Sequence, residues 1–430
     1  MLPLLLAFAC DFGWEDSTFG AGADDSGSVV HGDCDPAVTV PWGTQGEQGT
    51  PIPADPHRDS FGAAPDPRFV RIQWPSRDPS RSVAFLWQAD VDTMSSVVEI
   101  WPSAEDPAKA LRVEGYTFLF GGIDIGTGPY RQHEVRLCGQ LQPGTAYSYR
   151  VGGEGHWSST YSFTTPAAPG SFDSFRVAIV GDSRGDYGTW AQVLSAIDGH
   201  APDMILFSGD AIELGANQTE WEAWFEAAGD VLVRRPLVMA HGNHEFLAQH
   251  YYAHVAQPGN EEWFAIDYGP LLILALNDTV RSEDEIDSTQ KAFIEQELAA
   301  TTAPWRIAMH HQPAYSTCTT HGSDLDVRAA WSPALENGGV QLVTAGHNHI
   351  YERSVPIRDG EEQADGAGTV YMVSGGAGAP LYEENEVEWF GAVANPIEHY
   401  VIADYGPDAA EFVVRDLDGN VIDQFTIERW

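Results

Sequence analysis

The chain has 430 residues, of which 43% are hydrophobic, so it can bury a substantial core, and its length predicts two or three domains. Its charge is strongly unbalanced, because 22 Lys and Arg residues stand against 63 Asp and Glu residues, a formal net charge of -41. Such a surface repels nucleic-acid backbones and anionic head groups, which excludes general binding of nucleic-acid polymers. An anionic substrate would need local positive charge, and metal ions are its most compact source.

The N-terminal end predicts export. Residues 1–10 (MLPLLLAFAC) form a short apolar run that ends at Cys10, and residues 11–67 are rich in Gly, Pro and acidic residues, as in a flexible tether. The order resembles a bacterial lipoprotein signal, which implies a lipid anchor at Cys10 and a periplasmic, outer-membrane or cell-surface location. A truncated secretory signal, giving a secreted protein, or a misplaced start is the alternative. With Cys10 lipidated, three cysteines remain and allow at most one intramolecular disulfide.

Residues 68–166 predict an antiparallel β-sandwich. They consist of short alternating apolar runs separated by turn residues, such as SVAFLWQAD and AYSYRVGG, without helical spacing. The segment LQPGTAYSYRV resembles a characteristic stretch of fibronectin type III domains. That resemblance implies that Tyr147 folds back onto the turn before it.

Residues 174–430 predict an α/β domain. Seven apolar, β-branched runs read as strands, and residues 189–200, 219–232 and 288–300 have helical spacing. Asp287 and Gln290 have the spacing of a helix-capping pair. Near the C-terminal end, Asp418-Gly419 lies between two strand-like runs and predicts a hairpin.

Five of the predicted strands run directly into polar clusters. The clusters are Gly181–Gly185, Gly209–Glu213, His241–Glu245, His310–Tyr315 and Gly346–Arg353. Ligands of open α/β sheets gather at the carboxyl ends of strands, so these clusters are expected to converge. Asp, Asn and His without thiolates are donors for hard or borderline divalent or trivalent ions.

Taken together and in this order, the five clusters resemble the motifs of the calcineurin-like metallophosphoesterase superfamily. The fibronectin-like domain, the His-x-Pro-x-Tyr form of the fourth cluster and the Gly-His-x-His-x-Tyr-Glu-Arg form of the fifth are similar to the purple acid phosphatase branch. The resemblance implies a catalytic domain built as a β-sandwich flanked by helices. It also implies acid phosphatase-like hydrolysis of small phosphate monoesters.

The resemblance implies two metal ions, drawn from Fe, Zn and Mn. One ion would be held by Asp182, Asp210 and His349, and the other by Asp210, Asn243, His311 and His347. Two cations so close need a shared anion, which Asp210 would provide. A hydroxide on the pair would attack phosphorus, and His244 would act as a proton donor or electrostatic stabiliser near the leaving group.

Three further histidines could have either a functional or a structural role. His310 and His311 are adjacent, and neighbours in a strand face opposite ways. Pro313 and Tyr315 follow His311 at the spacing of the family motif, which selects His311 as the ligand and leaves His310 as a buried neighbour. His321, ten residues further on, is either a histidine that contacts substrate, as in the family, or an exposed loop residue.

Two positions depart from the family. Purple acid phosphatases carry a metal-bound Tyr three residues after the second-cluster Asp, and its phenolate on ferric iron gives them their colour; here the residue is Glu213. Glu213 is therefore either an extra ligand or a solvated loop acid. Arg184 replaces a Gly or His, and it either binds the substrate phosphate as a bidentate fork or pairs with a nearby acid.

Two other functions fit the same features. A phosphodiesterase or nucleotidase would use the same metals with more room around the phosphate. A cell-surface binding protein would use the fibronectin-like domain and carry a vestigial catalytic domain, although the intact set of ligands argues against this.

Overall fold

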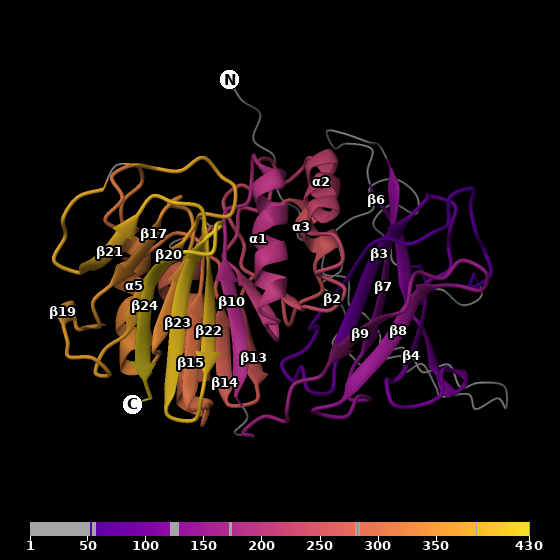
Figure 1. The fold of residues 1–430 in the computed structure, drawn as a ribbon, viewed down its shortest axis with the longest axis horizontal. Helices are drawn as coiled ribbons and strands as arrows, with labels where there is room; N and C mark the ends of the chain where they lie inside the picture. The colour runs from indigo at the N-terminus through magenta and orange to yellow at the C-terminus, as the bar shows by residue number, and fades with distance from the viewer. Residues whose placement is uncertain are drawn as a thin grey trace.

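The chain forms a β-sandwich followed by a larger α/β unit, and the two lie side by side (Figure 1). The computed structural model describes residues 52–53, 57–120, 129–171, 174–279, 282, 284–383 and 385–429. The predicted signal at 1–10, including Cys10, and most of the predicted tether at 11–67 lie outside these residues. No helix in the described part of the chain is long and apolar enough to cross a membrane.

The N-terminal unit is an antiparallel sandwich of two sheets, as predicted. Strand β3 shows why: Val83, Phe85 and Trp87 alternate into the core between the sheets, whereas Ala84 and Leu86 face the other way. The hydroxyl of Tyr147 accepts a hydrogen bond from the backbone N–H of Gln142 at 3.0 Å, so the predicted fold-back onto the turn is confirmed.

The strands of the sandwich form a five-stranded and a four-stranded sheet. The first has the order β1 (Ile52–Pro53), β6 (Tyr116–Phe120), β7 (Tyr130–Leu137), β3 (Val83–Ala89) and β2 (Arg68–Gln73). The second has the order β5 (Leu111–Glu114), β4 (Val97–Pro102), β8 (Ala146–Gly152) and β9 (Tyr161–Thr164), with a 3₁₀ turn at η1 (Pro107–Lys109).

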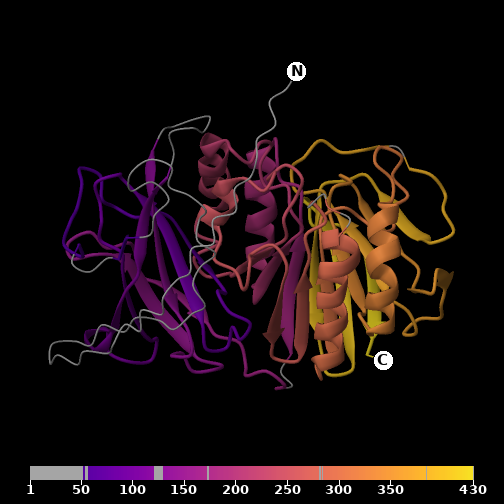
Figure 2. The same ribbon diagram turned by 180° about the vertical axis from the view of Figure 1, so that it is seen from behind.

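The α/β unit has four layers, with two sheets packed face to face and helices on both outer faces (Figures 1 and 2). Strand β10 (Phe175–Val180) illustrates the arrangement, since Val177 and Ile179 face the core between the sheets. Ala178 and Val180 face helices α1 (Tyr187–Gly199) and α2 (Gln218–Ala228). Helices α4 (Lys291–Ala300) and α5 (Leu325–Asn337) cover the outer face of the second sheet (Figure 2). This is the predicted β-sandwich flanked by helices.

The first sheet has six strands, in the order β12 (Leu237–Met239), β11 (Met204–Phe207), β10 (Phe175–Val180), β22 (His399–Tyr405), β23 (Ala409–Asp416) and β24 (Val421–Glu428). The second has seven, in the order β13 (Phe264–Tyr268), β14 (Leu271–Ala275), β15 (Trp305–Met309), β16 (Leu342–Ala345), β20 (Val370–Ser374), β17 (Tyr351–Ser354) and β21 (Gly391–Asn395). A small ribbon pairs β18 (Ile357–Arg358) with β19 (Glu361–Glu362). The predicted C-terminal hairpin is confirmed as β23 and β24.

The helices are α1 (Tyr187–Gly199), α2 (Gln218–Ala228), α3 (Gln249–His254), α4 (Lys291–Ala300) and α5 (Leu325–Asn337), with a π-helical turn at η2 (Glu285–Gln290). The three predicted helices are α1, α2 and α4. The predicted Asp287–Gln290 capping pair is wrong, because both residues lie within the π-helical turn. The side chain of Gln290 instead makes two hydrogen bonds to the backbone of Asn277, at 2.9 and 2.6 Å, and fixes the segment that follows β14.

The two units are joined by buried polar contacts. The Tyr149 hydroxyl donates to the Val233 carbonyl at 2.6 Å, and the Arg71 guanidinium donates to the His254 carbonyl at 2.9 Å. Buried polar groups with satisfied partners specify one docking geometry. Among the described cysteines, Cys318 is a free, buried thiol and Cys138 is disulfide-bonded.

Candidate active site

The six predicted ligand residues converge from both sheets onto one edge of the domain. Each follows the carboxyl end of a strand: Asp182 follows β10, Asp210 follows β11, Asn243 follows β12, His311 follows β15, and His347 and His349 follow β16. Strands β10, β11 and β12 run parallel to one another, as do β14, β15, β16 and β20, so their carboxyl ends share an edge within each sheet. The convergence expected from the sequence is therefore present.

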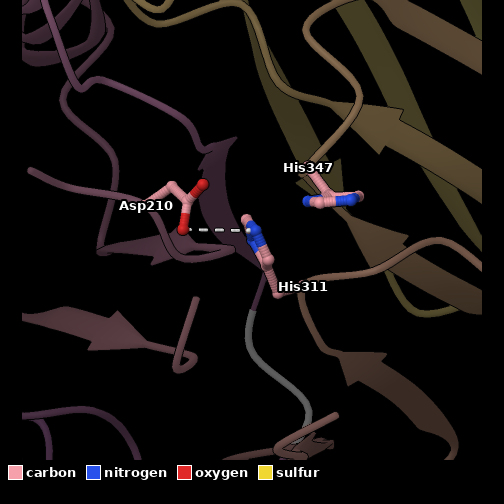
Figure 3. Close-up of side chains that lie close together, drawn as sticks. All are labelled: Asp210, His311 and His347. Carbon is pink, nitrogen blue, oxygen red and sulfur yellow. Dashed lines mark ion pairs between the residues drawn. The ribbon is translucent and has the colours of Figure 1, made fainter. Parts of the chain in front are cut away.

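Asp210, His311 and His347 form the centre of the site (Figure 3). One side-chain donor atom of each lies within 4.8 Å of those of the other two. Nε2 of His311 lies 3.3 Å from Oδ1 of Asp210 and 2.9 Å from Oδ1 of Asn243. Asn243 therefore belongs to the same cluster.

Asp182 and His349 lie beside this centre. Nε2 of His349 is 3.6 Å from Oδ1 of Asp182. The backbone N–H of His347 donates to both oxygens of Asp182 at 3.0 Å, and these hydrogen bonds join the first cluster to the fifth. The structure thus brings together all six residues that the sequence predicts as ligands.

Hydrogen bonds aim the imidazoles of His311 and His349. Nδ1 of His311 donates to the Ser208 carbonyl at 2.8 Å, and Nδ1 of His349 donates to the Pro380 carbonyl at 2.7 Å. In both rings Nε2 is left to face the carboxylates, and Nε2 of His349 is buried without a hydrogen-bond partner. Fixing Nδ1 in this way is how proteins orient histidine ligands.

The charges of the site favour cations. Burial and the nearby Asp210 raise the pKa of Asp182 well above its ordinary value. Burial opposes protonation of His311, but Asp210 and other carboxylates raise its pKa to about 10. Burial lowers the pKa of His347 to about 2 and that of His349 to about 4, so both rings are neutral and able to ligate. Two buried carboxylates and three imidazoles, of which those of His311 and His349 are oriented through Nδ1, fit bound metal ions.

Small residues make the close approach of the motifs possible. A Cβ at Gly242 would lie 2.3 Å from Oδ1 of Asp210, and a Cβ at Gly346 would lie 2.2 Å from Oδ2 of Asp182. Asp182, Asp210 and His347 themselves have φ angles of 58°, 58° and 65°, in the left-handed region that non-glycine residues seldom adopt. Such strain is concentrated at functional sites.

Comparison with known proteins identifies this arrangement. A model of calcineurin-like phosphoesterases matches residues 175–351, and a model of the purple acid phosphatase N-terminal domain matches residues 67–165. Together they span well over half of the chain. The chain carries a calcineurin-like phosphoesterase domain preceded by a purple acid phosphatase N-terminal domain, and the proteins similar to it include purple acid phosphatases.

Several proteins similar to this phosphoesterase are plant enzymes. Purple acid phosphatase 22 of Arabidopsis thaliana is 28% identical over 334 residues, covering 73% of this chain and 72% of the relative. A second protein of the same plant, Fe(3+)-Zn(2+) purple acid phosphatase 12, is 24% identical over 71% of this chain and 70% of its own length. The solved structure of purple acid phosphatase PPD1 from yellow lupin (Lupinus luteus) seeds shares the fold, with a TM-score of 0.74 at 20% identity, over 85% of this chain and 74% of that one.

The three other predicted site residues of this phosphoesterase lie around the ligands. His244 donates from Nδ1 to the Glu213 carbonyl at 2.6 Å, and its Nε2 is 3.9 Å from Oδ2 of Asp210. Arg184 places Nε 3.6 Å from Oδ2 of Asp210. His321 is exposed and packs its ring on His347, with centroids 4.4 Å apart.

His310 points away from the site, as predicted. Its Nδ1 is 2.9 Å from Oδ2 of Asp278, and its ring packs against Trp331. Asp278 also accepts hydrogen bonds from the backbone N–H groups of His311 and Gln312. The sequence analysis overlooked Asp278, although it follows β14 just as the ligands follow their strands.

Two further residues of the site have roles that the sequence analysis did not assign, although Glu245 lies in its third cluster. The Glu245 carboxylate is fully buried and accepts hydrogen bonds from the backbone N–H groups of Asp210, Ala211 and Gly242. Glu245 therefore joins the second cluster to the third through hydrogen bonds. Tyr382 stacks on His349 with ring centroids 4.2 Å apart and places its hydroxyl 3.3 Å from Nε2 of His321. Tyr382 lies in an irregular segment after β20, where no local pattern marks it.

Proposed function

We propose that this purple acid phosphatase-like enzyme is a binuclear metal-dependent phosphoesterase that hydrolyses small phosphate monoesters. The observation that carries the proposal is the orientation of the imidazole rings of His311 and His349. Nδ1 of His311 and of His349 is held by a backbone carbonyl, so Nε2 of each faces the carboxylates. Nε2 of His349 is buried without a hydrogen-bond partner. Because buried polar atoms in a protein core are normally hydrogen-bonded, this atom is better explained as a metal ligand than as part of a polar core.

We assign the ligands as the sequence predicts. Asp182, Asp210 and His349 would hold one ion, and Asp210, Asn243, His311 and His347 the other. When bound, a pair of divalent or trivalent cations supplies Lewis acidity and water of lowered pKa. Fe, Zn and Mn all fit this donor set. The similarity to Fe(3+)-Zn(2+) purple acid phosphatase 12 of Arabidopsis thaliana favours iron and zinc.

The surrounding residues act on the phosphate and its leaving group. His244 has Nδ1 fixed by the Glu213 carbonyl, so Nε2 is the atom that can exchange a proton with the leaving oxygen. Arg184 offers a guanidinium to phosphate oxygens. His321, at the exposed rim beside His347, would contact the ester group.

The substrate class is tested by a panel of phosphate esters. Metal-loaded enzyme is assayed for phosphate release from monoesters, diesters and pyrophosphates under identical conditions. The proposal predicts that monoesters have the highest kcat/KM. Preference for diesters would identify a phosphodiesterase on the same metals, and a lack of turnover of every ester by fully loaded protein would reject the function.

We also propose that the enzyme is exported, with Cys10 carrying a lipid anchor. The support is the apolar run at 1–10 and the polar stretch that follows it. In a bacterial host given labelled fatty acid, the wild-type protein should carry label and Cys10→Ser should not. Unlabelled wild-type protein in the medium would remove the anchor and leave export.

A further inference from the structure

Glu213 contacts two groups of the site through different atoms. Its Oε2 accepts a hydrogen bond from Nη1 of Arg184 at 2.5 Å. Its backbone carbonyl accepts one from Nδ1 of His244 at 2.6 Å. Glu213 thus lies outside the central cluster, and it is a solvated loop acid whose side chain also pairs with Arg184.

The backbone of Glu213 is itself held in place. The backbone N–H groups of Glu213 and Leu214 donate to Oε2 of Glu220, in the first turn of α2, at 2.9 and 3.0 Å. The Glu213 side chain is 53% exposed, whereas that of Arg184 is only 14% exposed. A half-exposed carboxylate on an anchored backbone therefore binds a guanidinium that is mostly covered.

Arg184 has a second anion within reach. Its Nε is 3.6 Å from Oδ2 of Asp210, and that Nε is buried without a hydrogen-bond partner. Without Glu213, the guanidinium would move toward Asp210, the carboxylate at the centre of the site. Glu213 draws Nη1 outward and leaves donors of the guanidinium fork free for an incoming anion.

We propose that Glu213 is a positioning residue that holds Arg184 at the rim of the site, where Arg184 clamps the phosphate of a dianionic monoester. The inference rests on the proposed function and deepens it, because a guanidinium fork matches two phosphate oxygens. Glu213 occupies the position at which the family resemblance implies a metal-bound Tyr, so a metal ligand is replaced by a substrate-orienting contact. His244 donates from Nδ1 to the backbone carbonyl of Glu213, and the same Nδ1 lies 3.8 Å from Oε1 of the Glu213 side chain.

The test is a double-mutant cycle on the metal-loaded enzyme with an aryl phosphate monoester. Arg184→Ala should lower kcat/KM by about 10-fold to 100-fold, the range for a lost hydrogen bond to a charged group. Glu213→Ala should cause most of the same loss, and the double variant should be no worse than Arg184→Ala alone. Inhibition by inorganic phosphate should weaken by a similar factor in all three variants.

A matched control separates positioning from general loss of charge. Glu99 pairs with Arg150 at 2.6 Å in the β-sandwich unit, and Glu99→Gln makes the same chemical change as Glu213→Gln far from the site. Glu99→Gln should leave kcat, KM and phosphate inhibition unchanged, while Glu213→Gln weakens both substrate and phosphate binding. Metal content and Tm are measured for every variant, and Arg184→Lys replaces Arg184→Ala if the latter fails to fold.

The outcomes separate this inference from the proposed function. Multiplicative losses in the double variant, or wild-type kinetics for Glu213→Ala, would overturn the positioning role of Glu213. Unchanged phosphate inhibition in Arg184→Ala would overturn the clamp. A wild-type enzyme that hydrolyses no phosphate ester would instead overturn the proposed function itself.

Discussion

His310 and His311 are consecutive in the chain, yet their rings enter different surroundings. Nε2 of His311 is 2.9 Å from Oδ1 of Asn243, whereas Nδ1 of His310 is 2.9 Å from Oδ2 of Asp278. Both follow directly after β15, where successive side chains point to opposite faces. One strand end therefore supplies a ligand to the site and a buried polar pair to the layer beneath it.

Replacing each histidine should separate catalysis from stability. His311→Ala should lose one of the two metals and most turnover, because the second ion loses an aimed imidazole. His310→Ala should keep both metals but lower the free energy of unfolding by about 3 kcal/mol, since it leaves the buried Asp278 carboxylate short of a partner. Metal content, kcat and Tm are measured for both variants. Metal loss in His310→Ala with retention in His311→Ala would reverse the assignment.

Glu245 should be essential for the stability of the site. Glu245→Ala leaves three buried backbone N–H groups without an acceptor, and each costs about 1–3 kcal/mol. We expect a large fall in Tm and weaker metal binding, because Asp210 and Gly242 lose their shared anchor. Glu245→Gln retains one acceptor oxygen and should lie between the wild type and Glu245→Ala. Wild-type Tm and metal affinity in Glu245→Ala would contradict this role.

The absorption spectrum should follow the residue at position 213. With Glu213 in place of the tyrosine of purple acid phosphatases, iron-loaded protein should lack the phenolate charge-transfer band. Glu213→Tyr should gain a visible band on iron loading, and Glu213→Phe is its control without the hydroxyl. A strong band in the wild type would show that another tyrosine, such as Tyr382 beside His349, reaches the metal.

The sequence predicts the ligand residues of this site better than the residues that hold the ligands in place. Each ligand follows a recognisable strand, and four of the six directly follow a glycine, so order and spacing identify them. Asp278 and Tyr382 act through contacts between segments distant in the chain, and no local spacing encodes those contacts. Helix α5 was missed because Pro333 lies inside it, and proline signals the end of a helix. The capping prediction at Asp287 failed because packing turned Gln290 toward Asn277.

Acid should weaken the fold through buried neutral histidines. Burial, with Arg131 nearby, lowers the pKa of His133 to about 3, and its ring stacks on Trp87. The unfolded chain takes up a proton near pH 6.5 while the folded chain does not, so stability is complete above pH 6.5 and falls as pH drops toward 3.

The loss from His133 alone should be about 2 kcal/mol at pH 5. Urea unfolding between pH 7 and pH 5 measures it, and His133→Gln should show a smaller fall over that interval. An identical fall in the wild type and in His133→Gln would show that His133 is not the source.

Metal titration of the metal-free protein, followed by release of inorganic phosphate from a monoester, tests the central claim most directly. Two equivalents should bind per chain, with turnover absent from the metal-free protein and rising to its full value as the second equivalent binds. Asp210→Asn, which removes the shared carboxylate, should not recover under the same titration. Full turnover in metal-free protein, or at a single equivalent, would contradict a binuclear metal-dependent phosphoesterase.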